Sequence, residues 1–349
     1  MNRVPLQIIF LTPIMMPYPF SQRYVESSVE LRRRGVYYLL IVTIIWGGTF
    51  VWMKQLLENA PLHLSVWDDK LVVSLFVAMR FIIAAILLFV LLPKSRKAIT
   101  KKTTWIGGLY IAIPMYFGFI IQMYALTNIS PAISAFLTSL YVIFTALIAI
   151  IFGKQTLSLP LAFGVIVATI GAAILGLGAD DSIFDIRLSS LGWASWATIF
   201  SALMFAIHIV VTDSVTKKFD PTDVSLTSFI IIALFSIISF LIVLFGSENS
   251  LAELVRLFSF IDIIIPLLLL GGFGSFIALL LLNTWQRHLS PVHAAIIYSL
   301  EPIWALTYSL FSGLETITIW LFVGGGLLLC GNLVVELFIR KKEKLSKDS

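Results

Sequence analysis

The sequence predicts an all-α membrane protein in which ten transmembrane helices form two inverted five-helix repeats. Three observations lead to this fold class: the composition, the length of the apolar runs, and a stretch that recurs in the second half. Of the 349 residues, 59% are hydrophobic and only 12% are charged, and the mean hydropathy is +0.99. A chain of this composition cannot cover itself with polar groups, so lipid is its solvent.

The apolar runs have the length of helices that cross a bilayer. They extend over roughly 20 residues, which matches a hydrocarbon layer about 30 Å thick. Strands of a membrane barrel would be about half as long and would alternate strictly. Helices are therefore expected near residues 36–56, 71–92, 105–126, 131–152, 160–178, 191–212, 224–245, 259–282, 292–311 and 318–339.

The stretch that begins at Ser130 recurs from Ser290 without a gap, at a constant spacing of 160 positions. Apolar segments match by chance in composition, but not in the positions of Pro, Gly and Ser. A duplicated helix bundle is typical of secondary transporters, with the site between the repeats. The matched pairs are Ser130 with Ser290, Pro131 with Pro291, Ala135 with Ala295, Ser139 with Ser299, Leu140 with Leu300, Gly153 with Gly313, Thr156 with Thr316, Gly164 with Gly324 and Gly171 with Gly331.

Basic residues gather in alternate loops, and this predicts the orientation of the helices. Lys and Arg accumulate in cytoplasmic loops. Both termini are therefore expected in the cytoplasm of a plasma (inner) membrane protein, and five helices per repeat, an odd number, make the repeats inverted. The basic groups are Arg32, Arg33, Arg34, Lys94, Arg96, Lys97, Lys101, Lys102, Lys217, Lys218, Arg340, Lys341, Lys342 and Lys344; the opposite loops hold Asp68, Asp69, Asp180, Asp181, Asp185, Glu248 and Glu253.

Four regions follow from these patterns: an N-terminal extension (1–34), the first repeat (35–178), the second repeat (179–339) and a basic cytoplasmic tail (340–349). The extension contains an apolar run that four prolines interrupt, so it is too broken to span the bilayer. Two interpretations stay open for it: an unstructured extension or upstream start, and a segment that lies on the membrane surface.

Polar residues form one stripe in the fourth predicted helix, and the repeat carries this stripe into the ninth. The first stripe is Ser134, Thr138, Tyr141 and Thr145, and the second stripe is Ala294, Tyr298, Glu301 and Ala305, which Tyr308 extends. Their spacing of three and four residues is one face of a helix. Because lipid gives no reason for polar groups on one face, both stripes should face the bundle interior. They line either a water-accessible cavity or a hydrogen-bonded seam between helices.

Glu301 and Arg80 are ionisable residues inside predicted spans. A carboxylate near the bilayer centre costs several kcal/mol unless it is paired, hydrated or protonated. Glu301 is thus either a site for a proton or a substrate amine, or a structural group bonded to backbone that Pro302 frees. Arg80 either binds a substrate carboxylate or phosphate, or it snorkels or pairs with a buried partner.

His208 and several aromatic residues complete the candidate site. His208 has no further metal-ligating residue at a suitable spacing in its helix, so it is either a hydrogen-bonded core residue or a lining or proton-transfer residue. Trp46, Tyr298 and Trp304 either form an aromatic cavity wall or pack against other helices. The candidate substrate-binding set is therefore Trp46, Arg80, Thr138, Tyr141, His208, Tyr298, Glu301 and Trp304.

Motifs of enzymes and cofactor sites do not occur. The chain has no phosphate-binding G-x-x-x-x-G-K-[ST] loop, no G-x-S-x-G elbow and no H-E-x-x-H pair. The sequence Gly176-Leu177-Gly178-Ala179-Asp180 departs from the G-x-G-D pattern of intramembrane proteases. With a single cysteine, Cys330, a cysteine-based metal site within one chain is excluded. We expect no enzyme, no cofactor, no metal site and no nucleic-acid partner.

Three local patterns resemble the drug/metabolite transporter superfamily, and specifically its EamA-type members. They are Trp46-Gly47-Gly48-Thr49-Phe50 followed by Lys54, Arg80-Phe81 followed by Ala84 and Ala85, and Ser299-Leu300-Glu301-Pro302-Ile303 leading to Gly313, Glu315 and Thr316. The resemblance covers roughly residues 36–339. It implies alternating-access transport of a small organic metabolite. Export of amino acids or related compounds is the preferred case, with protons as a candidate coupling ion.

The two halves depart from each other at positions that matter to this resemblance. Tyr141-Val142 stands where the second repeat has the family's usual Glu301-Pro302, and Gln155 stands where it has Glu315. A charge-dependent step would therefore belong mainly to the second repeat. Two other classes stay open: a structural or assembly membrane protein, which needs no polar stripe, and an intramembrane enzyme, which needs a catalytic pair.

Overall fold

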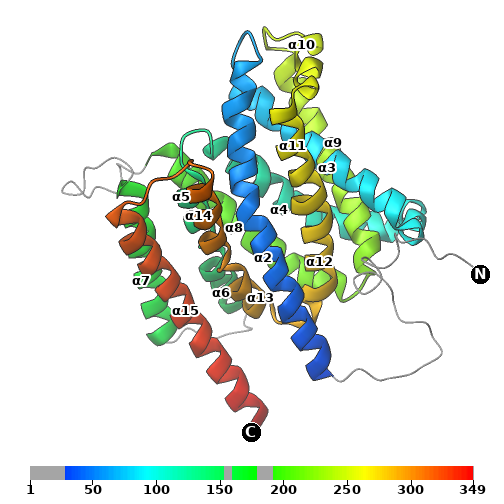
Figure 1. Ribbon diagram of the computed structural model, residues 1–349. Coiled ribbons are helices and arrows are strands. Elements are labelled where there is room, and N and C mark those ends of the chain that lie inside the picture. The colour runs from blue at the N-terminus through cyan, green and yellow to red at the C-terminus, as the bar shows by residue number, and fades with distance from the viewer. Residues whose placement is uncertain (1–27, 153–158, 179–191, 349) are drawn as a thin grey trace, which may run out of the picture.

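The computed structural model describes residues 28–152, 159–178 and 192–348, and these residues form helices and short connections without any strand (Figure 1). The expected loop acids Asp180, Asp181 and Asp185, the residues Gly153, Gln155 and Thr156, and nearly all of the N-terminal extension lie outside the described residues. In the first half the helices are α2 (Ser28–Asn59), α3 (Asp69–Leu91), α4 (Lys102–Ala125), α5 (Pro131–Thr138), α6 (Tyr141–Ile151) and α7 (Leu159–Gly178).

The second half repeats this order with two additions. A π-helical segment, Leu269–Ile277, joins α11 to α12 and makes them one long, irregular unit. A short helix outside the bundle, α10 (Leu251–Arg256), precedes this unit. The other elements are α8 (Trp193–Thr216), α9 (Pro221–Leu244), α11 (Ile261–Leu268), α12 (Ala278–Trp285), α13 (Pro291–Tyr298), α14 (Glu301–Phe311) and α15 (Ile319–Asp348), with the 3-10 segments Ala60–Leu62, Pro93–Thr100, Leu257–Ser259 and Gln286–His288 between helices.

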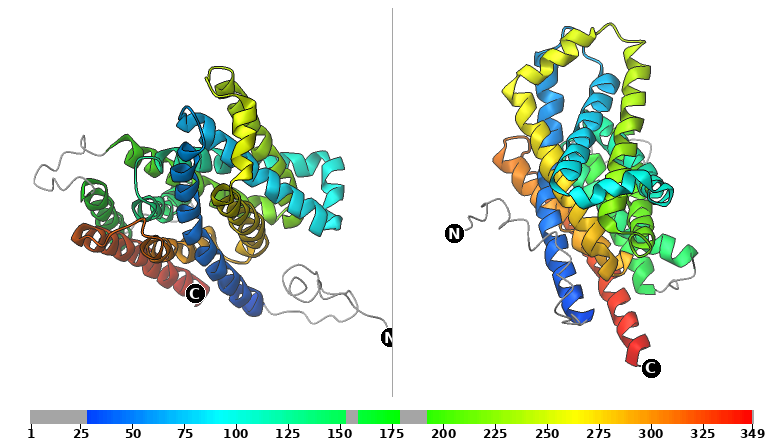
Figure 2. Two further views of the ribbon diagram at one scale, coloured as in Figure 1. Left: turned by 45° about the horizontal axis from the view of Figure 1, so that its top comes forward. Right: turned by 90° about the vertical axis from the view of Figure 1, so that its right-hand side faces the viewer.

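Eight helical segments of the described chain are long and apolar enough to cross a membrane. Two further apolar segments, Ala162–Ile174 in α7 and Ile319–Val334 in α15, are shorter. The helices lie where the apolar runs predicted them, and the protein is a multi-pass membrane protein. Figure 2 shows the helices from two further sides, with α15 and the start of α2 extending beyond the rest.

The helices expected at 131–152 and 292–311 are each broken into two, at equivalent positions of the repeat. α5 and α13 end at Thr138 and Tyr298, and α6 and α14 begin at Tyr141 and Glu301. Backbone hydrogen bonds at both breaks span three residues instead of four, which tightens the turn. In each repeat the serine at the break donates its hydroxyl to a carbonyl one turn earlier at 2.7 Å.

A repeated Ser-Pro pair begins both broken helices. The Oγ atom of Ser130 accepts the backbone N–H of Ile133, and the Oγ atom of Ser290 accepts that of His293. The proline that follows lies at the first helical position, where a missing N–H costs no hydrogen bond. The matched Ser and Pro positions of the sequence are therefore helix N-caps.

These two equivalent helices run in opposite directions. α5 begins beside the C-terminal part of α2, where the Nζ atom of Lys54 donates to the carbonyls of Leu126 at 3.0 Å and Ile129 at 3.4 Å. α13 begins beside the N-terminal part of α2, where Nη2 of Arg32 lies 3.4 Å from Nε2 of His293. Lys54, one of the family-like positions, thus caps the carbonyl end of α4.

Basic residues gather at one end of the bundle, and acidic residues gather at the opposite end. At the end where α2 begins, Arg287 donates to the carbonyl of Thr216 at 3.1 Å, beside the connection that holds Lys217 and Lys218. At the other end, Nε2 of His63 lies 2.9 Å from Oδ2 of Asp262. There the hydrogen bond from Ser65 lowers the pKa of the Glu253 carboxyl. The assignment of the basic end to the cytoplasm stays a prediction from the loop charges.

The last helices of the two halves, α7 and α15, pack through the repeated glycines. A Cβ atom on Gly171 would lie 2.6 Å from the carbonyl oxygen of Gly324, and one on Gly331 would lie 2.6 Å from that of Gly164. Each glycine therefore lets the partner backbone approach, and the two contacts are reciprocal. Membrane helices commonly associate through small residues spaced in this way.

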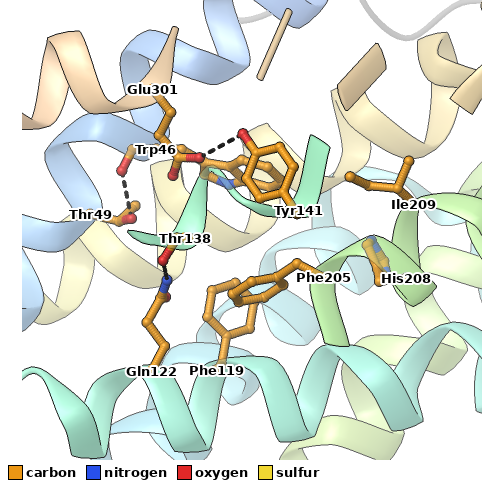
Figure 3. A pocket seen from close by; sticks show the side chains of 10 residues that line it. All are labelled: Trp46, Thr49, Phe119, Gln122, Thr138, Tyr141, Phe205, His208, Ile209 and Glu301. Carbon is orange, nitrogen blue, oxygen red and sulfur yellow. Dashed lines mark hydrogen bonds between the residues drawn. The ribbon is translucent and has the colours of Figure 1, made fainter. Parts of the chain in front are cut away.

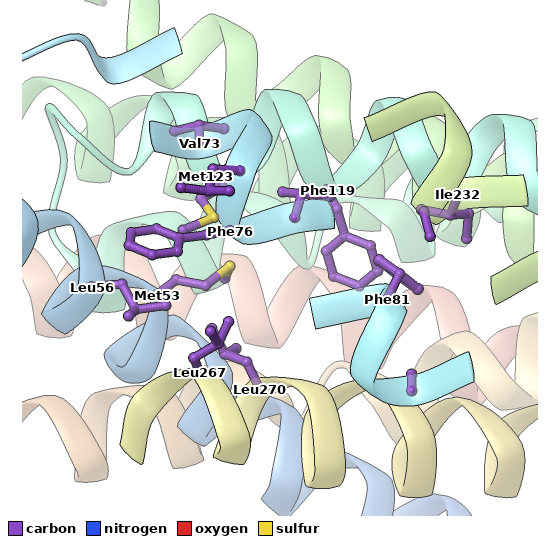
Figure 4. Packing of buried hydrophobic residues seen from close by; sticks show 14 of the residues in the cluster. Met53, Leu56, Val73, Phe76, Phe81, Phe119, Met123, Ile232, Leu267 and Leu270 are labelled. Atoms are coloured by element: carbon purple, nitrogen blue, oxygen red, sulfur yellow. The ribbon is translucent and has the colours of Figure 1, made fainter. Parts of the chain in front are cut away.

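Two buried hydrophobic clusters fill the bundle. The first contains side chains of α2, α3, α4, α9 and the α11–α12 unit, and Figure 4 shows part of it around Met53, Phe81 and Phe119. The second joins α2, α5, α6, α8, α12, α13 and α15. Trp46 and Phe205 pack against both clusters, so they lie where the clusters meet.

Gly331→Leu should destabilise the protein much more than Gly326→Leu, although both residues belong to α15. A side chain at 331 would collide with the backbone of α7, whereas a Cβ atom at 326 meets nothing within 4 Å. Overpacking of this kind costs about 1–3 kcal/mol. Thermal unfolding of the purified variants in detergent measures the difference, and equal melting temperatures would contradict the reciprocal packing.

Reporter fusions after Lys217 and after Ser250 should give opposite location signals, cytoplasmic for the first and external for the second. The expectation rests on the basic and acidic ends of the bundle, because Lys and Arg remain on the cytoplasmic side. Alkaline phosphatase and green fluorescent protein at each site report the two compartments. The same signal at both sites would reject this topology.

Candidate functional site

A cavity with an empty volume of about 410 Å³ lies between side chains of both halves. Most of its wall is apolar, and the polar groups converge from several helices (Figure 3). The lining residues are Trp46 and Thr49 from α2, Phe119 and Gln122 from α4, Thr138 from α5, Tyr141 from α6, Phe205, His208 and Ile209 from α8, and Glu301 from α14.

The hydroxyl of Tyr141 donates to the carboxylate of Glu301 at 3.3 Å (Figure 3). These two residues are mates in the repeat, and each begins the second half of a broken helix. The hydrogen bond therefore joins the two breaks directly. Both residues are buried, with 2% and 6% of their surface exposed.

The partner of Glu301 is a side chain of the other half rather than the backbone near Pro302. Of the two interpretations of this residue, the structural one assumed a bond to backbone that proline frees. Within the described residues, the carboxylate bonds to Tyr141 and faces the cavity. The carboxylate therefore lies where a solute in the cavity would contact it.

Both polar stripes face the interior, as the sequence predicted. All eight residues of the first and second stripes are buried. Thr138 accepts a hydrogen bond from Nε2 of Gln122 at 3.0 Å and lines the cavity. The hydroxyls of Ser134 and Thr145 are buried and have no hydrogen-bond partner among the described residues. The first stripe thus combines cavity lining with buried polar groups that have no protein partner.

Two of the expected aromatic residues lie behind the cavity wall. Tyr298 donates to Oε1 of Gln286 at 3.1 Å, and its ring packs against Trp46 with centroids 5.5 Å apart. Trp304 is half-buried and faces Gly47, where a Cβ atom would come 2.8 Å from the backbone nitrogen of Ala305. Neither lines the cavity, so Tyr298 and Trp304 position α2 and Trp46.

Trp46 itself lines the cavity and is held from the other half. Its Nε1 atom donates to the carbonyl of Gly274 in the π-helical segment at 3.2 Å. The hydroxyl of Thr49 donates back to the carbonyl of Trp46 at 2.7 Å. The family-like sequence around Trp46 therefore forms one wall of the cavity and its support.

Arg80 is buried in the bundle rather than at the interface, with 1% of its surface exposed. It does not line the cavity, but its guanidinium lies 4.0 Å from the centroid of the Phe119 ring, which does. Burial of this extent excludes snorkelling.

His208 both lines the cavity and is hydrogen-bonded in the core. Its Nδ1 atom lies 3.4 Å from the carbonyl of Ile111, and Thr212 lies beside the ring at 3.3 Å. No group of three or more metal-ligating side chains occurs within the residues that the structure describes.

Five lining residues were absent from the candidate set: Thr49, Phe119, Gln122, Phe205 and Ile209. Some signals were present. Thr49 belongs to the family-like segment, Phe205 shares a helix face with His208, and Gln122 is a polar residue within a predicted span. Phe119 and Ile209 carry no such signal, because an apolar side chain of a membrane helix faces lipid, core or cavity equally well.

Comparison with known proteins agrees with this architecture. The EamA-like transporter family matches the chain twice, over residues 33–177 and 192–337. The chain belongs to the EamA-like transporter family. A relative from Archaeoglobus fulgidus, described as an uncharacterized transporter, is 24% identical over 299 residues, which are 86% of this chain and 84% of the relative.

A solved crystal structure has a similar fold. Its TM-score is 0.53 at 15% sequence identity, and the match covers 86% of this chain and 98% of the other. At that identity the likeness concerns the fold alone. Family membership and the relative from Archaeoglobus fulgidus support a transporter built from two EamA repeats.

Single cysteines at Thr138, Tyr141 and Glu301, in a Cys330→Ser background, should react with small polar thiol reagents, because all three residues line the cavity. A cysteine at Ala305 should not, because Ala305 is fully buried in α14 and lies outside the lining. Labelling in membrane vesicles followed by mass spectrometry gives the reactivity. Equal protection at all four positions would favour a dry seam over a water-accessible cavity.

Proposed function

We propose that this protein is a secondary transporter that moves small organic metabolites across the plasma membrane by alternating access. The preferred case is export of amino acids or related compounds. The observation that carries the proposal is the hydrogen bond between the repeat mates Tyr141 and Glu301 at a cavity that both halves line. Sites of secondary transporters lie at the repeat interface, where discontinuous helices meet.

The proposed architecture has ten spans in two inverted five-helix repeats, over residues 35–178 and 179–339, with both termini in the cytoplasm. The short apolar helices α7 and α15 are the fifth and tenth spans. Opposite directions of α5 and α13 support the inversion. The reciprocal glycine contacts of α7 and α15 support it further, since one two-fold operation relates each contact to the other.

The two halves would rock about the paired breaks and open the cavity to each side in turn. Separation of α6 from α14 requires the bond between Tyr141 and Glu301 to break. A solute amine or a proton on the carboxylate competes with the Tyr141 hydroxyl for the same oxygen atoms. We therefore propose that Glu301 and Tyr141, together with Trp46, Thr138 and His208, bind the solute, and that Glu301 is the group for proton coupling.

The alternatives are a structural or assembly membrane protein and an intramembrane enzyme. The first does not require a polar cavity between repeats, and the second requires a catalytic pair of side chains. Glu301 and His208 line the same cavity, but each is hydrogen-bonded to a different partner. Transport accounts for the repeat, the breaks and the cavity together.

Purified protein in proteoliposomes, loaded in turn with labelled amino acids, amines and sugars, tests the proposal. Transport is expected for at least one amino acid or related compound and should change when a proton gradient is imposed. Empty liposomes and a Glu301→Ala variant serve as controls. Solute fluxes that equal those of empty liposomes across the whole panel would reject the proposed function.

Glu301→Gln should leave folding intact and flatten the pH dependence of transport. Gln keeps the shape of the side chain and its acceptor oxygen for the Tyr141 hydroxyl, but it cannot release a proton. The expression level and the melting temperature should therefore stay close to those of the wild type. Initial transport rates between pH 5 and pH 8 give the readout; an unchanged pH profile would mean that Glu301 does not couple transport to protons.

A further inference from the structure

Arg80 is a buried cation whose hydrogen-bonding capacity is largely unused. Its Nε atom donates to Oγ of Ser275 at 2.5 Å, and Nη1 contacts only the sulfur of Met53 at 3.7 Å, a weak acceptor. Nη2 is buried and has no partner among the described residues. A guanidinium has five N–H donors in a planar fork that matches a carboxylate. An unpaired buried donor is destabilising, and more so when it is charged.

One aromatic ring separates this cation from the cavity. The ring of Phe119 lies 4.0 Å from the guanidinium carbon of Arg80, and the same residue lines the cavity. The edge of the ring meets Phe205, another lining residue, with centroids 5.3 Å apart. Phe119 thus has the cation behind it and the cavity in front of it, and the cation–π contact partly compensates the buried charge.

The π-helical segment lies against both Arg80 and the Thr49 side of the cavity wall. A Cβ atom on Gly274 would lie 3.5 Å from Nη2 and 2.6 Å from Cγ2 of Thr49, a lining residue. The next residue, Ser275, holds Nε. Glycine at 274 therefore lets the segment approach Thr49 closely, beside Nη2 of Arg80. Single π-helical turns inside α-helices often occur at functional sites.

The cavity also has an acidic side chain, Glu301, on another part of its wall. No ion pair joins the two side chains in the described structure. The cavity therefore has a carboxylate in its wall and a cation one ring behind the wall. Opposite charges that are held apart in this way are complementary to a solute that carries both an anionic and a cationic group.

We propose that Arg80 is the anion-binding residue of the cavity and that Phe119 covers it until a carboxylate-bearing solute displaces the ring. The inference rests on the proposed transport function and names its substrate class: small carboxylates, and in particular amino acids. The carboxylate would bind Nη1 and Nη2 of Arg80, and the amine would bind Glu301. Displacement of the ring exchanges one cation–π contact for a charge-assisted pair of hydrogen bonds.

The first experiment compares phenylacetate with phenylacetamide, which has nearly the same shape and no charge. Binding to the purified full chain in detergent is measured by thermal shift titration. The anion should bind about tenfold or more tightly, as expected for charge-assisted hydrogen bonds to a buried group. Equal affinity of the two compounds for the wild-type protein would overturn the proposal without any variant.

Two variants test whether Arg80 causes the preference for the anion. Arg80→Gln should abolish the preference for the anion, so that the two compounds bind alike. Arg96→Gln is the matched control, because Arg96 also stacks on a phenylalanine, with its guanidinium 4.9 Å from the Phe89 ring, but lies in an exposed loop. A preference that survives Arg80→Gln, or one that is lost in Arg96→Gln, would contradict the assignment.

Phe119→Leu tests the cover separately and keeps the cation in place. Removal of the ring should raise the affinity for phenylacetate about threefold or more, since the anion no longer has to displace the ring before it reaches Arg80. Phenylacetamide should show no matching gain. If Arg80→Gln does not fold, Phe119→Leu alone tests the proposal. An unchanged or lower affinity for phenylacetate would then refute the proposal that Phe119 covers Arg80.

Failure of the inference and failure of the proposed function can be told apart. Transport of amines and amides at the rates of the matching amino acids would contradict the anion subsite but would agree with the proposed transport function. Phenylacetate binding that depends on Arg80, in a protein that transports no member of the panel, would support the subsite and reject the function.

Discussion

The contact between Tyr141 and Glu301 determines how the two halves of this protein meet. Lipid offers no partner for a polar group, so a broken helix is tolerated inside a membrane only where protein or water surrounds the break. Here each break lies against the other, and the hydrogen bond at 3.3 Å joins the first residues of α6 and α14. The cavity lies at this meeting point, and Trp46 and Thr138 line it beside the pair.

The supports of the site cross from one half to the other. Gly274, in the second half, accepts from Trp46, and Ser275 accepts from Arg80, both in the first half. A shift of the π-helical segment would therefore move an aromatic wall residue and the buried cation together. This coupling is a direct consequence of hydrogen bonds in a medium of low dielectric, where an unmade bond is costly.

Much of this organisation could be predicted from the sequence. The matched Ser130 and Ser290 are N-caps, and Gly171 and Gly331 are close-packing positions, because these residue types have few other uses at fixed places in a membrane helix. The inward direction of both stripes followed from helical periodicity. Family resemblance drew attention to Trp46 and Glu301, and both line the cavity.

Other features depend on tertiary packing and leave little trace in the sequence. The break in the first repeat contains neither glycine nor proline, since Ser139 and Leu140 occupy it, so nothing local distinguishes it from a continuous helix. Tyr298 belongs to the second stripe by periodicity but turns to Gln286, four residues before the start of the repeated stretch at Ser290. Only the path of the chain after α12 brings the two together. Tertiary packing, rather than a local sequence signal, also makes Phe119 and Ile209 lining residues.

Tyr141 and Glu301 also make the two halves chemically asymmetric, because they occupy equivalent positions of the repeat. If the halves were identical, the inward-facing and outward-facing conformations would have the same free energy. An empty protein would then divide its time equally between them. A phenol on one side and a carboxyl on the other remove that degeneracy. Under the proposed alternating-access mechanism, the empty protein would therefore favour one facing before any gradient acts, and exchanging these two side chains between the halves would change that preference.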